Sequence, residues 1–178
     1  MPIEIERKFL LASDAWRESV HAVIDMAQGY LNDAASVAQG AQNTSVRVRI
    51  EAEQAHLNIK SRELRARRQE FDYPIPLQDA RALIGLCVGG IVEKRRHLLR
   101  HGAHLWEIDE FRRENAGLVV AEIELADENE DFVRPAWLGR EVTHLARYYN
   151  LAIAARPYSQ WTRDERAMHA TQGDAPCL

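Results

Sequence analysis

The sequence lacks most of the features that mark secreted, membrane-spanning or nucleic-acid-binding proteins. Its two cysteines, Cys87 and Cys177, have no metal-binding spacing and form no disulfide framework, which favours a reduced, cytoplasmic setting. No apolar run approaches membrane-spanning length, and charges begin at Glu4, so the N-terminus does not resemble a signal peptide. The formal net charge is −4, which supplies no overall basic field for nucleic acid. We therefore expect neither a membrane nor a nucleic acid as partner.

Common ligand-binding motifs are also missing. Gly85, Gly89 and Gly90 form neither a phosphate-binding loop nor a dinucleotide-binding turn. The run RELRARRQE, residues 62–70, is basic, but it lacks the interleaved aromatic residues on which RNA bases stack. We interpret this run as an exposed hairpin connection.

With 178 residues, of which 46% are hydrophobic and 28% charged, the chain has the size and composition of one soluble globular domain. Helical spacing predicts a helix from Ser13 to about Gln28, a second over 77–88 that Gly89-Gly90 stop, and a third that begins near Pro135. Period-two alternation predicts strands over 44–51, 55–62, 69–75, 91–99, 104–112 and 117–126. The polar tail 163–178 is expected to fray.

Charged residues follow the same period of two. In IEIERKF, residues 3–9, the side chains of Glu4, Glu6 and Lys8 share one face of a strand, opposite the apolar ones. Later strands carry charges two apart, mostly of one sign: Arg47 with Arg49, Lys60 with Arg62, Glu70 with Asp72, Lys94 with Arg96, Glu107 with Asp109, and Glu122 with Glu124. Because like charges on one face repel, chance patterning of a surface would mix the signs.

Two interpretations fit this pattern. The charged face lies in bulk water, as on the outside of many antiparallel sheets. Alternatively, the sheet closes with helices outside, so that the charged face points inward. Ions in a dry interior cost several kcal/mol each, so the second arrangement needs a wet lumen, interleaved signs and a charged ligand. Such a barrel is a site for a polyanion with divalent cations.

The same residues resemble a known family in chain order. The segment EIERK resembles the ExExK signature of the CYTH superfamily, the triphosphate tunnel metalloenzymes. The resemblance extends over about residues 2–161 through QGYL (28–31), VRVRI (46–50), LNIK (57–60), QEFDYPI (69–75), VEKRR (92–96), WEIDEF (106–111), VVAEIEL (119–125), WLGREVT (137–143) and RYYN (147–150). One alternating strand is a weak signal, whereas this ordered series is specific. It is most similar to short bacterial members that look like inorganic triphosphatases.

The resemblance implies an α+β fold: an antiparallel closed β-barrel, an eight-stranded tunnel, with helices packed outside. It implies a CYTH domain over residues 1–162, followed by the tail 163–178. It also implies a site for two divalent cations, Mg²⁺ or Mn²⁺, because these hard ions take carboxylate oxygens. The implied metal ligands are Glu4, Glu6, Asp109, Glu122 and Glu124.

For the substrate, the resemblance implies a set of basic side chains, in which arginine contacts phosphate bidentately and lysine acts as a point charge. This substrate-binding set is Lys8, Arg47, Arg49, Lys60, Lys94, Arg96 and Arg156. The implied catalytic set is Glu4, Glu6, Lys8, Glu122 and Glu124. Two roles fit Glu70 and Asp72: we interpret them as residues that orient the arginines, and metal binding is the alternative.

The chain departs from the family pattern in two places. Asp72 stands where related sequences usually have Glu, which shortens the side chain and keeps its charge. After RYYN the family continues with Ser, Asn and a Lys that reaches the phosphates, whereas this chain reads LAIAAR, with Arg156 in place of the lysine. Tyr148 and Tyr149 have two interpretations: they close one end of the tunnel, or they are ordinary half-buried aromatic residues.

The implied reaction is the metal-dependent hydrolysis of inorganic triphosphate to pyrophosphate and phosphate, in a cytoplasmic monomer or homodimer. Phosphoryl transfer requires charge neutralisation and in-line positioning more than a protein nucleophile. Two alternatives stay open. The same tunnel would act on an organic triphosphate (nucleoside or thiamine triphosphate, or ATP cyclised to cyclic AMP). In the second alternative, the chain is a non-catalytic module that binds polyphosphate. Its full set of carboxylates disfavours this alternative.

Overall fold

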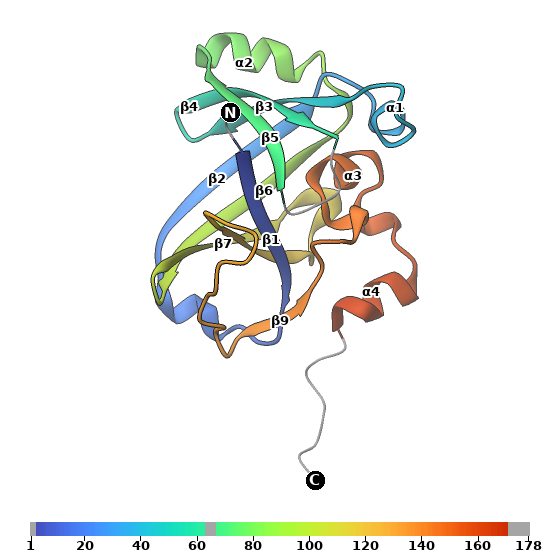
Figure 1. The fold of residues 1–178 in the computed structure, drawn as a ribbon. Helices are drawn as coiled ribbons and strands as arrows, with labels where there is room; N and C mark the ends of the chain where they lie inside the picture. The colour runs from blue at the N-terminus through green and yellow to red at the C-terminus, as the bar shows by residue number, and fades with distance from the viewer. Residues whose placement is uncertain (1–2, 63–66, 171–178) are drawn as a thin grey trace.

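The chain folds as a closed antiparallel β-barrel with short helices around it (Figure 1). In this computed structural model the described residues are 3–62 and 67–170. The barrel consists of β1 (Ile3–Leu11), β2 (Val20–Tyr30), β3 (Thr44–Glu51), β4 (Gln54–Ser61), β5 (Arg67–Pro74), β6 (Val88–His101), β7 (His104–Phe111) and β8 (Val119–Glu124). Around the barrel the order is β1-β5-β4-β3-β2-β6-β7-β8, and β8 returns to β1. The predicted fold class is confirmed.

Strand β1 closes the barrel because it pairs along both of its edges. Residues 6–9 pair with β8 on one edge. On the other edge, residues 3–5 pair with β5, and Phe9 and Leu11 pair with a ninth strand, β9 (Leu138–Glu141). The two ends of the sheet therefore meet at the first strand of the chain.

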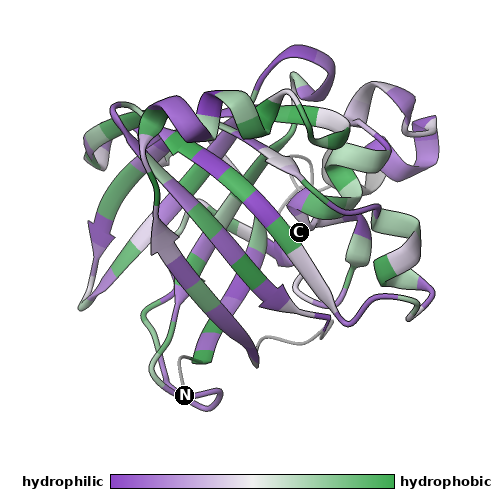
Figure 2. Cartoon of the chain, turned by 90° about the horizontal axis from the view of Figure 1, so that it is seen from above, coloured by the Kyte–Doolittle hydropathy of each residue, from purple (hydrophilic) through white to green (hydrophobic). Residues whose placement is uncertain are grey.

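Hydrophilic and hydrophobic residues alternate along barrel strands (Figure 2). Successive side chains of a strand point to opposite faces, so the two kinds of residue lie on opposite sides of the wall. The register places Lys60 opposite Glu70 and Arg96 opposite Asp109. Residues that lie opposite each other share a face of the sheet, and Lys60, Glu70 and Arg96 line a cavity in the lumen. The charged face of the sheet is therefore the inner one, as the second interpretation of the charge pattern requires.

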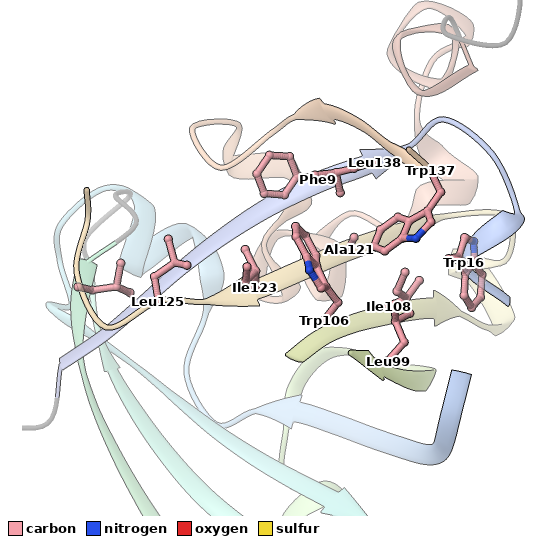
Figure 3. Packing of buried hydrophobic residues seen from close by; sticks show 11 residues of the cluster. Phe9, Trp16, Leu99, Trp106, Ile108, Ala121, Ile123, Leu125, Trp137 and Leu138 are labelled. Carbon is pink, nitrogen blue, oxygen red and sulfur yellow. The ribbon is translucent and has the colours of Figure 1, made fainter. Parts of the chain in front are cut away.

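One apolar cluster packs on the outside of the barrel wall, under the 3-10 helix η1 (Ala15–Ser19) and the segment that precedes β9 (Figure 3). Trp106 of β7 is fully buried there. Its ring centroid lies 5.8 Å from that of Phe9, 5.5 Å from Phe132 and 5.4 Å from Trp137, each in an edge-to-face arrangement. Aromatic pairs in this geometry stabilise beyond the area that they bury.

A second apolar cluster fills one end of the barrel interior. Tyr30, Val92, Phe111 and Val120 come from β2, β6, β7 and β8, on the inward positions of these strands, and are buried together. The 3-10 helices η3 (Ala146–Tyr148) and η4 (Tyr158–Gln160) and the helix α3 (Asn150–Ala155) add Tyr148 and other side chains to the same cluster. The interior of the barrel thus has an apolar zone and a charged zone.

The remaining elements cover the outside. Helix α2 (Leu77–Ile84) packs Ala80 against Val48 and Ala55 on the outer face of β3 and β4. Helix α1 (Ala34–Ala38) begins at Asp33, whose carboxylate accepts a hydrogen bond from the Ser36 backbone N at 2.8 Å. The last elements are η2 (Arg113–Asn115) and α4 (Arg163–Ala170). In the part of the chain that the structure describes, no helix is long and apolar enough to cross a membrane.

Two of the predicted helices are wrong. Of the segment 13–28, only Ala15–Ser19 is helical, and residues 20–30 form β2, which pairs with β3 on one edge and β6 on the other. The segment after Pro135 contains β9, which pairs with β1. In both cases the hydrogen-bonding partner lies far away in the sequence, so a local pattern does not reveal it.

Two further predictions need correction. The helix predicted over 77–88 ends at Ile84, and Gly89 and Gly90 lie within β6 instead of stopping the helix. A Cβ atom at Gly90 would lie 3.1 Å from the carbonyl oxygen of Ala154, so these glycines allow α3 to approach the strand. The first part of the tail predicted to fray is helix α4, and residues 171–178 lie outside the described residues.

Replacing Trp106 with alanine is expected to lower the free energy of unfolding by about 3–5 kcal/mol, because it empties a fully buried site in the outer cluster. Urea unfolding followed by far-ultraviolet circular dichroism measures this loss. Val133 is 60% exposed, so Val133→Ala is a control with an expected change below about 0.5 kcal/mol. A loss below about 1 kcal/mol for Trp106→Ala would contradict a stabilising role of the outer cluster.

Candidate active site

The lumen holds a cavity of about 610 Å³ whose wall is mostly charged. Strands β1, β7 and β8 contribute carboxylates, β3, β4 and β6 contribute cations, and β5 contributes both. The charged residues that line it are Glu4, Glu6, Arg47, Arg49, Lys60, Arg68, Glu70, Asp72, Arg96, Glu107, Glu122 and Glu124. The fold thus gathers the predicted site residues in one place, except Lys8, Lys94, Asp109 and Arg156.

Glu4 is the centre of the first ion-pair network. Its carboxylate accepts hydrogen bonds from Lys60 Nζ at 2.9 and 3.0 Å and from Arg68 Nε at 2.6 Å. Burial by itself would raise the pKa of Glu4, but the charges of Lys60 and Arg68 outweigh burial and hold that pKa far below its usual value. Glu4 therefore stays ionised at neutral pH.

Lys60 carries the opposite shift. Burial, together with the positive charges of Arg47 and Arg68, lowers the pKa of Lys60 to about 8, although Glu4 and Glu6 favour the charged form. Its ammonium group also lies 3.1 Å from a carboxylate oxygen of Glu70. Cations crowd this part of the cavity closely enough to favour the arrival of an anion.

Glu122 and Arg96 form the second network. Arg96 Nη2 donates to Glu122 at 2.8 Å, and the same guanidinium binds Asp109 through two bonds of 2.8 and 2.7 Å and also contacts Glu107. Lys8 contacts the other oxygen of Glu122. Burial would raise the pKa of Glu122, but Lys8, Lys94 and Arg96 outweigh it and lower that pKa well below its usual value.

Lys94 and Asp109 lie beneath this network instead of on the cavity wall. The side chains of Lys94 and Asp109 are buried and paired with each other, and Arg96 covers the carboxylate from the cavity side. Both oxygens of Asp109 already accept hydrogen bonds from these two cations. The predicted roles of Asp109 in metal binding and of Lys94 in phosphate binding stay predictions.

Arg156 is also away from the first cavity. Its guanidinium binds Glu165 of α4 at 2.9 and 2.7 Å and the carbonyl oxygen of Gln160 at 3.1 Å. It lines a second cavity, which Lys8 lines as well.

Tyr148 and Tyr149, for which the sequence left two interpretations, lie in different surroundings. Tyr148 is buried in the apolar cluster of the interior. The ring of Tyr149 lies 5.4 Å from Lys8 Nζ.

Sequence reasoning missed Arg68. The basic run 62–70 is not simply an exposed connection, because β5 begins at Arg67 and puts Arg68 on the inner face, opposite Glu4. Arg62 is exposed and donates to the Ala38 carbonyl oxygen, and residues 63–66 lie outside the described part. A signal was present, since Arg68 is in phase with Glu70 at the period of two.

Asn58 was missed as well. It lies opposite both Arg47 and Asp72, and its Oδ1 accepts from Arg47 Nε at 3.2 Å. Its Nδ2 donates to Asp72 at 2.6 Å and to Glu70 at 3.2 Å. Glu70 and Asp72 thus act on Arg47 mainly through this amide, which refines their predicted orienting role. Its position two residues before Lys60 was the available signal.

Like charges also meet on the inner wall. The register places Glu6 directly opposite Glu124, a like-charge contact that costs free energy and that the ion pairs of Glu6 with Lys8 and Arg68 offset in part. Partial burial and the negative charges of Glu4 and Glu6 raise the pKa of Glu124. Within residues 3–62 and 67–170, no three histidine, cysteine or carboxylate side chains converge in a preformed metal cluster. The carboxylates offer hard oxygen donors, but mostly as partners of lysine and arginine.

Comparison with known proteins identifies the family. The CYTH domain family matches residues 2–155 of this chain. The chain belongs to the CYTH domain family. This confirms the resemblance carried by EIERK and the motifs that follow it.

Relatives of this CYTH domain protein share most of its length. A protein of Acetivibrio thermocellus named inorganic triphosphatase is 38% identical over 159 residues, which cover 89% of this chain and 97% of that protein. A protein of Nitrosomonas europaea with the same name is 33% identical over 154 residues, or 85% and 96% of the two chains. The crystal structure of the inorganic triphosphatase NE1496 superposes with a TM-score of 0.60 at 30% identity, over 86% of this chain and 95% of that one.

The buried pair of Lys94 and Asp109 should show strong coupling in this CYTH domain protein. Asp109→Leu alone is expected to cost about 3–5 kcal/mol of stability, because it leaves the buried charge of Lys94 without its partner. Lys94→Met alone is expected to cost less, because Arg96 still pairs with Asp109. The double variant is expected to lose less than the sum by at least about 1 kcal/mol. Urea unfolding of the unchanged protein, the two single variants and the double variant completes this double-mutant cycle. Additive losses of stability would contradict the pairing.

Lys60 is expected to titrate at about pH 8 in metal-free protein, whereas Lys8 keeps its proton above the ordinary 10.5. The sequence contains three lysines, Lys8, Lys60 and Lys94, so ¹³C-dimethyl-lysine NMR assigned with Lys→Arg variants can separate them. Between about pH 8 and 10.5 the unfolded chain keeps a proton that folded Lys60 has released, so this group makes stability rise with pH there. A Lys60 signal that moves only above pH 10 would contradict the shift.

Proposed function

We propose that this CYTH domain protein hydrolyses inorganic triphosphate to pyrophosphate and phosphate with the help of Mg²⁺ or Mn²⁺. The observation that carries the proposal is the lumenal cavity, where cations of β3, β4 and β6 face carboxylates of β1, β7 and β8. The names of the two curated relatives support it, because both are inorganic triphosphatases that align over most of this chain.

The cations of the cavity suit a compact polyanion. We assign phosphate binding to Arg47, Arg49, Lys60 and Arg96, and we add Arg68, which lies between the two cavities. Arginine matches phosphate geometry with two parallel N–H donors. Lys8, Lys94 and Arg156 complete the predicted set, with Lys8 and Lys94 acting from below the wall through the field that they create.

The carboxylates suit a divalent cation. Glu6 and Glu124 oppose each other as like charges, and Glu4 adds to the negative field that raises the pKa of Glu124. We assign metal binding to Glu4, Glu6, Glu122 and Glu124, with Asp109 behind them, and we propose two ions per site. Such ions would neutralise phosphate charge during transfer. Hard ions that keep several waters do not require a closed cage of protein ligands, which agrees with a cavity whose carboxylates are mostly paired with lysine and arginine.

The side chains around Glu122 and the cations of the cavity have defined tasks in this proposal. Arg96 and Lys8 hold Glu122 ionised and fixed, so its carboxylate does not take up the proton released when water attacks. Lys60 and Arg68 hold a terminal phosphoryl group in line with the attacking water. Thr143 fixes Lys8, since its Oγ1 accepts from the Lys8 backbone N at 3.0 Å. The chain provides positioning and charge instead of a nucleophile.

Location and assembly are also proposals. We place the protein in the cytoplasm because its cysteines are few and Cys87 is free. We propose a monomer or a homodimer, with the triphosphate as its small-molecule partner.

Purified protein is expected to release phosphate from triphosphate with Mg²⁺ or Mn²⁺ and to stop when EDTA is added. Glu124 is exposed, so Glu124→Gln should keep the fold while lowering kcat by roughly 100-fold. Arg68→Gln should raise KM by roughly 10-fold or more, because it removes a charge-assisted phosphate contact. Initial rates measured by phosphate release give both numbers.

The matched control is Arg113→Gln, since Arg113 is exposed and paired with Glu93 outside the barrel. It should leave kcat and KM unchanged. Pyrophosphate, ATP, thiamine triphosphate and cyclic AMP formation are assayed in the same panel. Failure to release phosphate from triphosphate with either metal ion would refute the proposed function.

A further inference from the structure

A second cavity of about 420 Å³ adjoins the first one. It lies between α1 and α3, two helices that contact each other at one side of the barrel (Figure 1). Arg47, Lys60 and Arg68 line both cavities, so these three cations separate the two spaces. The lumen therefore has a second compartment beside the charged one.

The walls of this second cavity differ from those of the first. Lys8, Arg62 and Arg156 also line it, but most of the wall is apolar and includes Val37 of α1 and Leu151 and Ala152 of α3. The free energy of the system falls when an apolar group displaces water from such walls. Inorganic triphosphate has no such group. The walls therefore favour a ligand that carries both an anion and a small hydrocarbon portion.

Arg47 provides the anchor for the anionic end. It is 6% exposed, and its Nη2 has no hydrogen-bond partner among the described residues. The nearest carboxylate oxygen, of Glu70, is 3.8 Å from this nitrogen, which exceeds hydrogen-bond distance. A buried guanidinium N–H without an acceptor is costly. Because Arg47 lines both cavities, a phosphate oxygen that enters from either one would satisfy it.

We propose that the second cavity binds small phosphate monoesters with an apolar group. The phosphate contacts Arg47, Lys60 and Arg68, and the apolar group packs between α1 and α3. Because these cations also line the first cavity, such a ligand competes with any phosphate chain bound there. Binding itself does not depend on the proposed hydrolysis, and only the competition rests on it.

Isothermal titration calorimetry with the full chain in metal-free buffer tests this proposal with 1-naphthyl phosphate as the probe. It is expected to bind at least tenfold more tightly than inorganic phosphate and than 1-naphthol, because each of these lacks one of the two contacts. Equal affinities for naphthyl phosphate and inorganic phosphate would overturn the proposal.

Cavity-filling variants locate the binding site. Ala152→Leu narrows the second cavity and should weaken naphthyl phosphate at least tenfold while leaving the affinity for inorganic phosphate unchanged. Ala35→Leu on α1 lines the same cavity from an exposed position and serves if Ala152→Leu is unstable. Ala82→Leu, on an exposed position of α2 away from the cavity, is the matched control. Unchanged naphthyl phosphate affinity in a folded filling variant would overturn the assignment.

Initial rates of triphosphate hydrolysis test whether naphthyl phosphate competes with the substrate. In protein active on triphosphate, naphthyl phosphate should raise KM without changing kcat, and Ala152→Leu should remove this inhibition. Tight binding without competition would refute the sharing of Arg47, Lys60 and Arg68. If the protein does not hydrolyse triphosphate, the proposed function fails, and the calorimetric result still decides the second cavity.

Discussion

Charge compensation inside the barrel is the constraint on which the rest of this structure depends. An ion removed from water costs several kcal/mol unless an opposite charge and hydrogen bonds replace its hydration. Arg96 meets this requirement for three carboxylates, Glu107, Asp109 and Glu122, and as an arginine it stays charged when buried. The strand order meets this need by placing the acidic strands β7, β8 and β1 between β6 on one side and β5 and β4 on the other, which carry the cations.

The same pairing turns ligand binding into an exchange of partners. Lys60 and Arg68 already form ion pairs with Glu4. A phosphate group that binds them replaces the Glu4 carboxylate, and the two cations have already lost most of their hydration during folding. In the proposed reaction the released carboxylate becomes available to a cation. Preorganised charges stabilise a developing charge without the reorganisation that free solvent requires. The arrangement of ion pairs that stabilises the barrel therefore also suits the cavity to polyanions.

Because the charged face of the sheet points inward, most of the apolar core lies on the outer face of the barrel wall. Trp106 and Phe9 pack under η1 and the segment before β9, while α2 covers the outer face of β3 and β4. The barrel interior is apolar only at one end, around Phe111 and Tyr148. The short helices therefore do more than connect strands, since they bury the face of the sheet that would otherwise meet water.

The alternation of residues determined by itself which side chains share a face, and hence most of the cavity wall, because a strand allows only two directions. It predicted seven of the nine strands that the structure describes and left two arrangements of the charged face open, and the resemblance to the CYTH family implied the closed barrel. Neither could set how deep a side chain lies. The register across β6 and β7 put Lys94 and Asp109 beneath Arg96. Pairing of β5 with β1 brought Arg68 to Glu4, and pairing on both edges made residues 20–30 a strand despite their helical spacing. Partners distant in the sequence decide such features, because hydrogen bonds between strands form only once the sheet closes.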